Sequence, residues 1–216
     1  GIDYTLAVKT DGTLWGWGKS SSGNIGHYVP YTDPGEAFTP VQVAGGGTTW
    51  SYLCEGDDNM GIKTDGTLWG WGSNEQGRLG VHSTLQVSQP TQPYGGGTWK
   101  CASSHYYGSP AVKTNGTLWC LGAVSSQLWV GGSSTSFGRT CITPIPYVGA
   151  FAGTDWNYAT TPGGYWRFGG IKTNGAMYFW GINTYKGWAL PNQPESLTSI
   201  TAPYQVSGTW SQLSMG

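Results

Sequence analysis

A ten-residue phrase, KTDGTLWGWG, stands at 9–18 and again, letter for letter, at 63–72. Weaker copies stand at 113–122 and 172–181, so the four opening lysines are 54, 50 and 59 residues apart. Four units of about 54 residues therefore fill the 216-residue chain. A fixed period of this size is typical of a solenoid or a propeller. A catalytic signature is usually written once per site, so the repeat points to architecture first.

Each copy of the phrase predicts a β-hairpin. Asp-Gly or Asn-Gly between two apolar runs is the strongest short hairpin signal, and a type I′ turn requires positive φ at both central residues. We therefore expect hairpins near 6–18, 60–72, 110–122 and 169–181. The strand after each turn is not a clean alternation of polar and apolar residues, which is typical of a sheet covered on both faces.

Two further strands per unit follow from the other recurring phrases. A Pro-x-Gln-Val phrase at 40–43 returns at 203–206 and is looser in the middle units, and its proline suits an edge strand. A Gly-rich approach leads each time to a tryptophan that begins another strand: Trp50, Trp99, Trp156 and Trp210. Four strands per unit make the blade of a β-propeller.

At these residues the chain resembles the RCC1-like repeat family, named for the regulator of chromosome condensation. The family phrase is matched by Trp50, Gly56, residues 62–72, NEQGRLG at 74–80, and Pro90. Units three and four keep the hairpin but lose most of the NEQGRLG part. The resemblance covers the whole chain and implies an all-β fold, a β-propeller of four blades. Residues 1–216 would form one RCC1-like propeller domain or a propeller fragment.

The number of blades departs from the family, whose propellers usually close with seven. In repeat register the last residue would run directly into the first, which suits a ring sealed by its own termini. It equally suits a piece of a longer array. We slightly favour a larger ring, completed by further repeats or by another copy. Because the first residue is Gly1 and not Met, we expect a processed or excised product.

Charge and hydropathy exclude several classes of function. Lys and Arg number 10, Asp and Glu 11, and the net charge is −1. This balance offers no electrostatic footprint for nucleic acid. No apolar run approaches the ~20 residues that span a bilayer. The four cysteines form no CxxC pair, so a zinc site is disfavoured. We expect buried thiols, with a Cys120–Cys141 disulfide as the minor alternative.

Catalytic and metal-binding candidates are few. His27, His82 and His105 fall in expected loops with no fixed relation to a nucleophile. The run Asp57-Asp58-Asn59 lacks the alternating spacing of a calcium loop, and a polar turn is expected there. The sequence therefore predicts no catalytic residue, no metal and no cofactor.

Binding candidates are the aromatic residues outside the repeat register. Trp15, Trp17, Trp69 and Trp71 recur in register and are expected in the core, whereas an interrupted unit on a rigid scaffold is where binding function tends to lie. The clearest interruption is 157–169, NYATTPGGYWRFG, although packing of this loop on its own blade is as favoured as binding. The candidates are Tyr158, Tyr165, Trp166, Arg167, Tyr106, Tyr107, Trp129 and Trp188.

The leading hypothesis is a non-enzymatic propeller that binds a protein or a glycan, in an extracellular, surface or virion-associated setting. The family namesake implies an alternative, an intracellular regulator of a small GTPase, although no stretch here matches the wedge the namesake uses. A hydrolase with a site on one propeller face is the third hypothesis. Fold alone does not decide among them.

Overall fold

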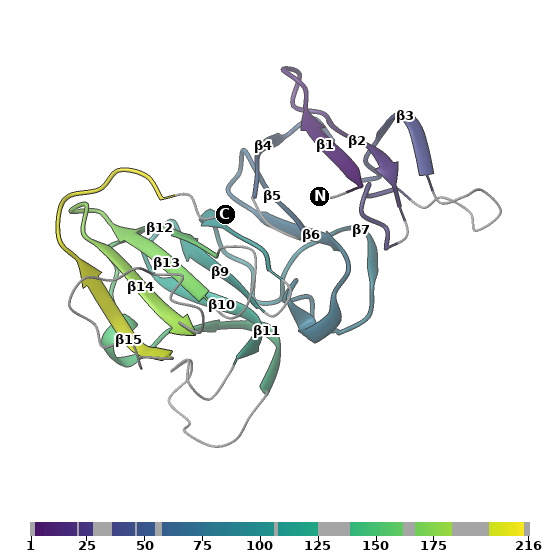
Figure 1. The fold of residues 1–216 in the computed structure, drawn as a ribbon. Coiled ribbons are helices and arrows are strands. Elements are labelled where there is room, and N and C mark those ends of the chain that lie inside the picture. The colour runs from purple at the N-terminus through teal and green to yellow at the C-terminus, as the bar shows by residue number, and fades with distance from the viewer. Residues whose placement is uncertain are drawn as a thin grey trace.

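The computed structural model describes residues 3–20, 22–27, 36–45, 47–54, 58–105, 108–124, 139–161, 167–182 and 199–213. Within these ranges the chain forms fifteen strands, two 3₁₀ turns and no α-helix. The strands are grouped into four antiparallel sheets, each built from consecutive strands of one repeat unit. Figure 1 shows the sheets following one another along an arc, with β3 at one end and β15 at the other. The prediction of an all-β propeller is confirmed.

The first sheet contains β1 (Tyr4–Val8), β2 (Leu14–Lys19) and β3 (Glu36–Gln42). The second contains β4 (Trp50–Leu53), β5 (Asn59–Lys63), β6 (Leu68–Gly72) and β7 (Val87–Thr91), with the turn η1 (Glu75–Gly77) before β7. The third contains β8 (Trp99–Ala102), β9 (Gly108–Lys113), β10 (Leu118–Val124) and β11 (Arg139–Pro146).

The fourth sheet contains β12 (Trp156–Thr160), β13 (Arg167–Lys172), β14 (Met177–Ile182) and β15 (Ser199–Val206), preceded by the turn η2 (Gly149–Phe151). Within the described residues the first sheet therefore has three strands where the others have four. We call β4, β8 and β12 the first strands, because each begins its sheet.

The hairpin turns lie where the sequence predicts them, but their type differs from the prediction. Gly12 donates its N–H to the Lys9 carbonyl at 2.9 Å, and Lys9 donates to the Thr13 carbonyl at 2.8 Å. Only the glycine has positive φ, +79° at Gly12 and +82° at Gly66, whereas Asp11 and Asp65 do not. This is a three-residue loop closed by a glycine bulge, not a two-residue type I′ turn.

The residues around each turn form a short chain of hydrogen bonds. The Asp65 carboxylate accepts from the Thr67 N–H at 2.9 Å and from the Thr67 hydroxyl at 2.6 Å. That hydroxyl in turn accepts from the Trp69 indole N–H at 2.8 Å. The same relay recurs in the first and third units, which explains why the phrase reads Asp/Asn-Gly-Thr-Leu-Trp.

The lysines that end β5 and β9 lie against aromatic rings. The ammonium of Lys63 is 5.0 Å from the ring centroid of Trp50 and 4.1 Å from that of Trp69. In the third unit Lys113 lies 4.9 Å from Trp99 and 4.1 Å from Trp119. Each of these lysines thus joins a first-strand tryptophan to the tryptophan that follows the hairpin turn, Trp69 in β6 or Trp119 in β10, by cation–π attraction.

The core lies between neighbouring blades. One cluster combines Cys101 and Tyr147 of the third unit with Trp156, Phe168 and Trp180 of the fourth. The register tryptophans that begin the first strands, Trp50, Trp99 and Trp156, are 2%, 4% and 1% exposed. Of the hairpin tryptophans predicted to lie in the core, Trp71 is buried, whereas Trp15, Trp17 and Trp69 are half-buried. Each blade therefore depends on its neighbours for burial of its apolar faces.

The cysteines contribute to this packing. Cys101 and Cys120 are buried, and Cys54 is half-buried. The Cys120 thiol lies 3.7 Å from the Leu121 carbonyl and donates to it, so the alternative Cys120–Cys141 disulfide is not formed in this structure. The side chain of Cys141 lies outside the described residues.

Candidate functional site

A groove of about 420 Å³ lies where four equivalent segments meet. Its lining comes from the one or two residues that follow each register tryptophan: Tyr52 in β4, Lys100 and Cys101 in β8, Asn157 and Tyr158 in β12, and Ser211 and Gln212 after β15. Equivalent positions of units arranged around an axis can meet only near that axis. We call this site the axial groove.

Lys100 gives the axial groove a positive charge. Its exposed ammonium donates a hydrogen bond to the Asn157 side-chain oxygen, a neutral acceptor. Other cations pair differently: Lys19 with Asp3, Arg78 with Asp58, and Lys172 with Asp155. None of the seven groove residues is a carboxylate. Among the residues that the structure describes, the groove therefore presents an ammonium group and no acidic side chain beside it.

Two tyrosines and a thiol complete the chemistry of the groove. Tyr52 is 38% exposed, and Tyr158 is half-buried against the apolar clusters of the third and fourth blades. Burial raises the pKa of the Cys101 thiol, so it stays protonated at neutral pH and is a poor nucleophile. The groove thus offers phenol, amide and ammonium groups, which suit recognition of a polar or acidic group.

The structure separates the binding residues that the sequence predicts. Tyr158 lines the axial groove, whereas Arg167 begins β13, is half-buried, and is not among the groove residues. The Arg167 carbonyl accepts a 2.8 Å hydrogen bond from the Thr161 hydroxyl. The other candidates lie outside the described residues and stay predictions: Tyr106, Tyr107, Trp129, Tyr165, Trp166 and Trp188.

Sequence reasoning missed Tyr52, Lys100, Asn157 and Gln212. A usable signal existed, because these residues occupy the first or second position after a register tryptophan in each unit. Strand alternation places the residue next to a buried tryptophan, such as Lys100 or Asn157, on the other face of the strand. Tyr52 is two positions from its tryptophan, and the strand pairing has an irregularity between Trp50 and Tyr52.

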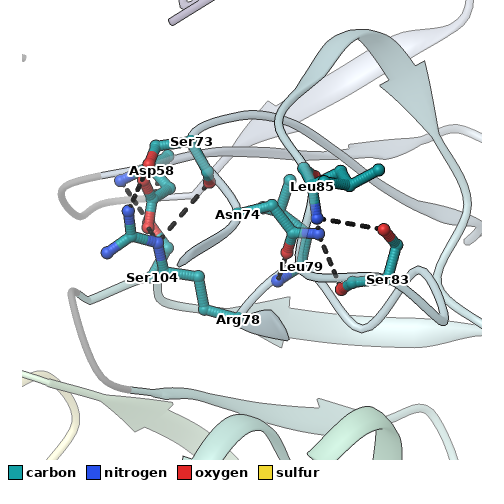
Figure 2. Close-up of polar contacts among 8 residues, drawn as sticks. All are labelled: Asp58, Ser73, Asn74, Arg78, Leu79, Ser83, Leu85 and Ser104. Carbon is teal, nitrogen blue, oxygen red and sulfur yellow. Dashed lines mark hydrogen bonds and ion pairs between the residues drawn. The ribbon is translucent and has the colours of Figure 1, made fainter. Parts of the chain in front are cut away.

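A second polar cluster surrounds Asp58 and Arg78 (Figure 2). The two side chains form an ion pair of 2.7 Å, and each is 4% exposed. Arg78 also donates to the Ser73 hydroxyl at 2.6 Å. The Ser104 hydroxyl donates to the Asp58 carbonyl at 2.6 Å and accepts from the Asp58 N–H at 2.9 Å, which joins the second blade to the third. These groups are buried and tie two blades together through an ion pair and hydrogen bonds, so the cluster is structural.

Asn74 holds the neighbouring loop in the same view. Its side chain accepts from the Leu79 N–H at 3.0 Å and donates to the carbonyls of Ser83 and Leu85 at 2.8 and 3.0 Å. The NEQGRLG phrase at 74–80 thus encodes a loop organised by its first residue.

The described part of the chain contains no group of three His, Cys, Asp or Glu that could hold a metal ion. In that part, no helix has the length and apolarity needed to cross a membrane. Asp58 of the Asp57-Asp58-Asn59 run is engaged by Arg78, and Asp57 lies outside the described residues.

Four sheets of one repeat unit each, joined through shared cores, define the chain as a β-propeller of sequence repeats. No protein-family model matches it. The human E3 ubiquitin-protein ligase HERC2 is 34% identical over 96 residues, which cover 41% of this chain and 2% of HERC2. Human protein RCC2 is 28% identical over 90 residues, 41% of this chain and 17% of RCC2.

Two solved propellers resemble nearly the whole chain. The crystal structure of human WBSCR16 has a TM-score of 0.74 at 18% identity, over 95% of this chain and 51% of WBSCR16. Yeast RCC1 (Prp20), solved bound to Kap60, has a TM-score of 0.75 at 15% identity, over 96% of this chain and 47% of Prp20. The chain therefore spans about half the length of the solved propellers. Together these comparisons confirm the resemblance to the RCC1-like repeats.

The comparisons correct the expected extracellular, surface or virion-associated location. The relatives of this chain include a ubiquitin-protein ligase and RCC2. Prp20 has also been solved in a study of its binding to Gsp1p and histones. These are proteins of the cell interior, so the extracellular expectation is wrong. It rested on low charge and high Gly, Ser and Thr content, which describe a rigid uncharged surface and carry no information about compartment.

Proposed function

We propose that this chain is a non-enzymatic, intracellular propeller module that binds a protein partner through the axial groove, with an acidic side chain of the partner seated at Lys100. The observation that carries the proposal is the exposed Lys100 ammonium, whose hydrogen bond goes to the neutral Asn157 amide. An incoming carboxylate would gain a charge-assisted hydrogen bond there.

The surroundings of Lys100 support a protein partner. Tyr52 and Tyr158 come from two different blades, and tyrosine is among the residue types enriched at interface hot spots. The first strands hold both rings on a rigid scaffold, which lowers the entropy cost of binding. Prp20 has been solved bound to the protein Kap60 and is described as binding Gsp1p and histones. None of these partners is a glycan, so the relatives favour a protein partner for this chain.

Regulation of a small GTPase is the second candidate, and it is the more specific form of the same proposal. It is favoured by the likeness to the family namesake, whose yeast form has been solved and described as binding Gsp1p. A hydrolase is less well supported, because the described groove residues pair no acid with a base and the Cys101 thiol is held protonated.

The first experiment tests the groove directly. A photo-crosslinking phenylalanine analogue would replace Tyr158 in one variant and Tyr94, which is 63% exposed and outside the groove, in a matched control. We expect a protein from a cell extract to be captured at position 158 and not at position 94. Equal capture at both positions would contradict the groove as the binding site.

The second experiment measures affinity for the captured protein after its purification. Lys100→Glu should weaken binding by about 30-fold, the effect of losing a hot-spot contact of ~2 kcal/mol. Lys19→Glu, which removes an exposed ion pair, should leave the dissociation constant nearly unchanged. Equal effects of the two substitutions would overturn the role of Lys100.

A third experiment decides the second candidate. Release of a fluorescent guanine nucleotide would be measured from a panel of small GTPases, with and without the chain. Accelerated release that is lost in Lys100→Glu would establish the regulator. No acceleration on any GTPase would remove this candidate and leave the broader protein-binding proposal to the crosslinking result.

A further inference from the structure

The hairpin turns of the third and fourth blades each contain an asparagine followed by a glycine. Asn115-Gly116 and Asn174-Gly175 are the two Asn-Gly pairs of the sequence, whereas the first two blades carry aspartate at the same position. An asparagine side chain in front of glycine is open to attack by the next backbone nitrogen, because glycine has no Cβ to hinder the approach. These two turns are therefore places where the chain can modify itself.

The reaction converts the side-chain amide into an acid in two steps. The Gly175 nitrogen attacks the Asn174 Cγ atom, its proton leaves with the side-chain amino group as ammonia, and a five-membered succinimide ring forms. Water then opens the ring at one of its two carbonyl carbons. Opening at Cγ gives aspartate. Opening at the former main-chain carbonyl gives isoaspartate, in which the backbone runs through the side chain.

Hydrogen bonds hold both turns back from this reaction. The Gly116 N–H donates to the Lys113 carbonyl at 2.8 Å, and the Gly175 N–H donates to the Lys172 carbonyl at 2.9 Å. Both glycines are buried, although the asparagine before each of them is exposed. The nitrogen can attack only after its N–H has left the carbonyl, so the turn must open locally before the ring forms.

The two turns differ in how firmly the asparagine side chain is held. The Asn115 oxygen accepts from the Thr117 N–H at 3.1 Å and from the Thr117 hydroxyl at 2.7 Å, and this hydroxyl accepts from the Trp119 indole N–H. The Asn174 oxygen accepts from the Ala176 N–H at 3.0 Å, and alanine has no hydroxyl to supply the second bond. Releasing Asn174 therefore breaks one of these hydrogen bonds, whereas releasing Asn115 breaks two.

We propose that Asn174-Gly175 is a spontaneous modification site, at which the chain forms isoaspartate faster than at Asn115-Gly116. Isoaspartate inserts the Cβ methylene into the main chain, which displaces the Gly175 carbonyl. That carbonyl accepts the 2.8 Å hydrogen bond from the Trp210 N–H, and a Cβ atom on Gly175 would clash with the Thr209 side chain. The turn is thus closely packed, and the modification loosens its contact with Trp210.

The aspartate product leaves this contact in place. Asp11 and Asp65 occupy the same turn position, and each accepts the N–H of the residue two positions later, as Asn174 does. The longer backbone, and not the new charge, is what disturbs the turn. Neither Asn-Gly pair is among the residues of the axial groove, so this site is independent of the protein-binding proposal.

Ageing of the purified chain at neutral pH tests the proposal. Peptide mass spectrometry after digestion at mildly acidic pH follows loss of the amide at both pairs, and an isoaspartate-specific methyltransferase labels the isoaspartate. We expect Asn174 to react about fivefold faster than Asn115, the effect of one hydrogen bond of ~1 kcal/mol. In urea, where both turns are unfolded, the two rates should be equal. Equal rates in the folded chain would overturn the proposal, as would a difference that persists in urea or a lack of label at position 174.

Exchanging the residue two positions after each asparagine tests the cause. Thr117→Ala removes the hydroxyl and should speed the reaction at Asn115 about fivefold, whereas Ala176→Thr should slow it at Asn174 by the same factor. Threonine is the native residue at this position in the first three blades, so the turn accommodates it. Thermal unfolding of both variants checks that the fold is retained. Rates that do not respond to either exchange would contradict the role of the hydroxyl.

Amide exchange at Trp210 tests the consequence. The fraction that contains isoaspartate should exchange this N–H faster than the fresh chain. Asn174→Asp, which carries the new carboxyl on an ordinary backbone, is the matched control and should exchange like the fresh chain. The same exchange rate in all three samples would show that the turn tolerates the longer backbone and would exclude the loosening.

Discussion

The backbone N–H of Trp156 donates a 3.1 Å hydrogen bond to the carbonyl of Gly116, the turn glycine of the preceding blade. The contact leaves no room above the glycine, since a Cβ atom there would stand 2.0 Å from the Thr154 carbonyl oxygen. The hairpin turn of one blade is thus also the contact point for the first strand of the next.

Gly116→Ala should therefore destabilise the fold through two effects. Its φ of +79° costs an L-residue about 1–2 kcal/mol, and the clash with Thr154 adds about 1–3 kcal/mol. Gly149→Ala is the control, because Gly149 has φ of +64° and no atom within 4 Å of the added carbon. Urea unfolding should show the larger loss for Gly116→Ala, and equal losses would contradict the close contact.

The turn aspartates should make stability depend on pH in the acid range. Hydrogen bonds from the Thr67 hydroxyl and then the Thr67 N–H lower the pKa of Asp65, and Thr13 does the same for Asp11. Because the folded pKa lies below the unfolded value of about 3.9, the stabilisation is present above that pH. It is lost as the pH falls through the folded pKa.

The double variant Asp11→Asn/Asp65→Asn tests this dependence. Asparagine keeps the side-chain acceptor, as Asn115 and Asn174 show in the later units. We expect the melting temperature of the variant to fall less between pH 5 and pH 2 than that of the parent chain, since the variant lacks two titrating carboxyls. Identical acid slopes would show that these two turns do not contribute.

Arg78→Met should be among the most damaging substitutions. It leaves the Asp58 carboxylate, 4% exposed, without its ion-pair partner, and breaking a buried pair in this way costs about 3–5 kcal/mol. Lys19→Met breaks the exposed pair with Asp3 and should cost less than about 1 kcal/mol. Chemical unfolding of both variants compares the two losses, and similar values would argue that the Arg78 pair is not buried in solution.

Asn74 offers a test of how the loop before β7 is held. Asn74→Asp keeps an acceptor for the Leu79 N–H but loses both donors, whereas Asn74→Ala loses all three hydrogen bonds. Each buried group left unsatisfied costs about 1–3 kcal/mol, so both variants should be less stable than the parent. Faster amide exchange at Leu79 in Asn74→Ala than in Asn74→Asp would confirm the assignment, and equal exchange would contradict it.

The sequence predicted the blades well because the determinants of a hairpin are local. The 54-residue period, the Asp/Asn-Gly turns and the register tryptophans each reappear in the structure. The turn type was wrong because Asp11-Gly12 also fits a three-residue loop. The Thr13 N–H and hydroxyl both donate to the Asp11 carboxylate, and these hydrogen bonds favour the three-residue loop. The Asp-Gly signal for a two-residue turn does not take Thr13 into account.

The axial groove could not be predicted, because no single unit contains it. The residues after the register tryptophans are Ser-Tyr, Lys-Cys, Asn-Tyr and Ser-Gln, and they share no chemical type. Their proximity depends on how four blades are arranged around the axis. Aromatic residues that interrupt the repeat pointed instead to the loop at 157–169. Of the two described binding candidates in that loop, Tyr158 lines the groove and Arg167 does not.

The hydrogen bonds from Trp50, Trp99, Trp156 and Trp210 to the preceding turn glycines join only adjacent blades, so the chain behaves as a one-dimensional array. In such an array each blade is held by its own strands and by its contacts with neighbouring blades. The less buried β1 should therefore exchange its amide hydrogens faster than the almost wholly buried β9. Unfolding would then be graded along the arc and not a single all-or-none event.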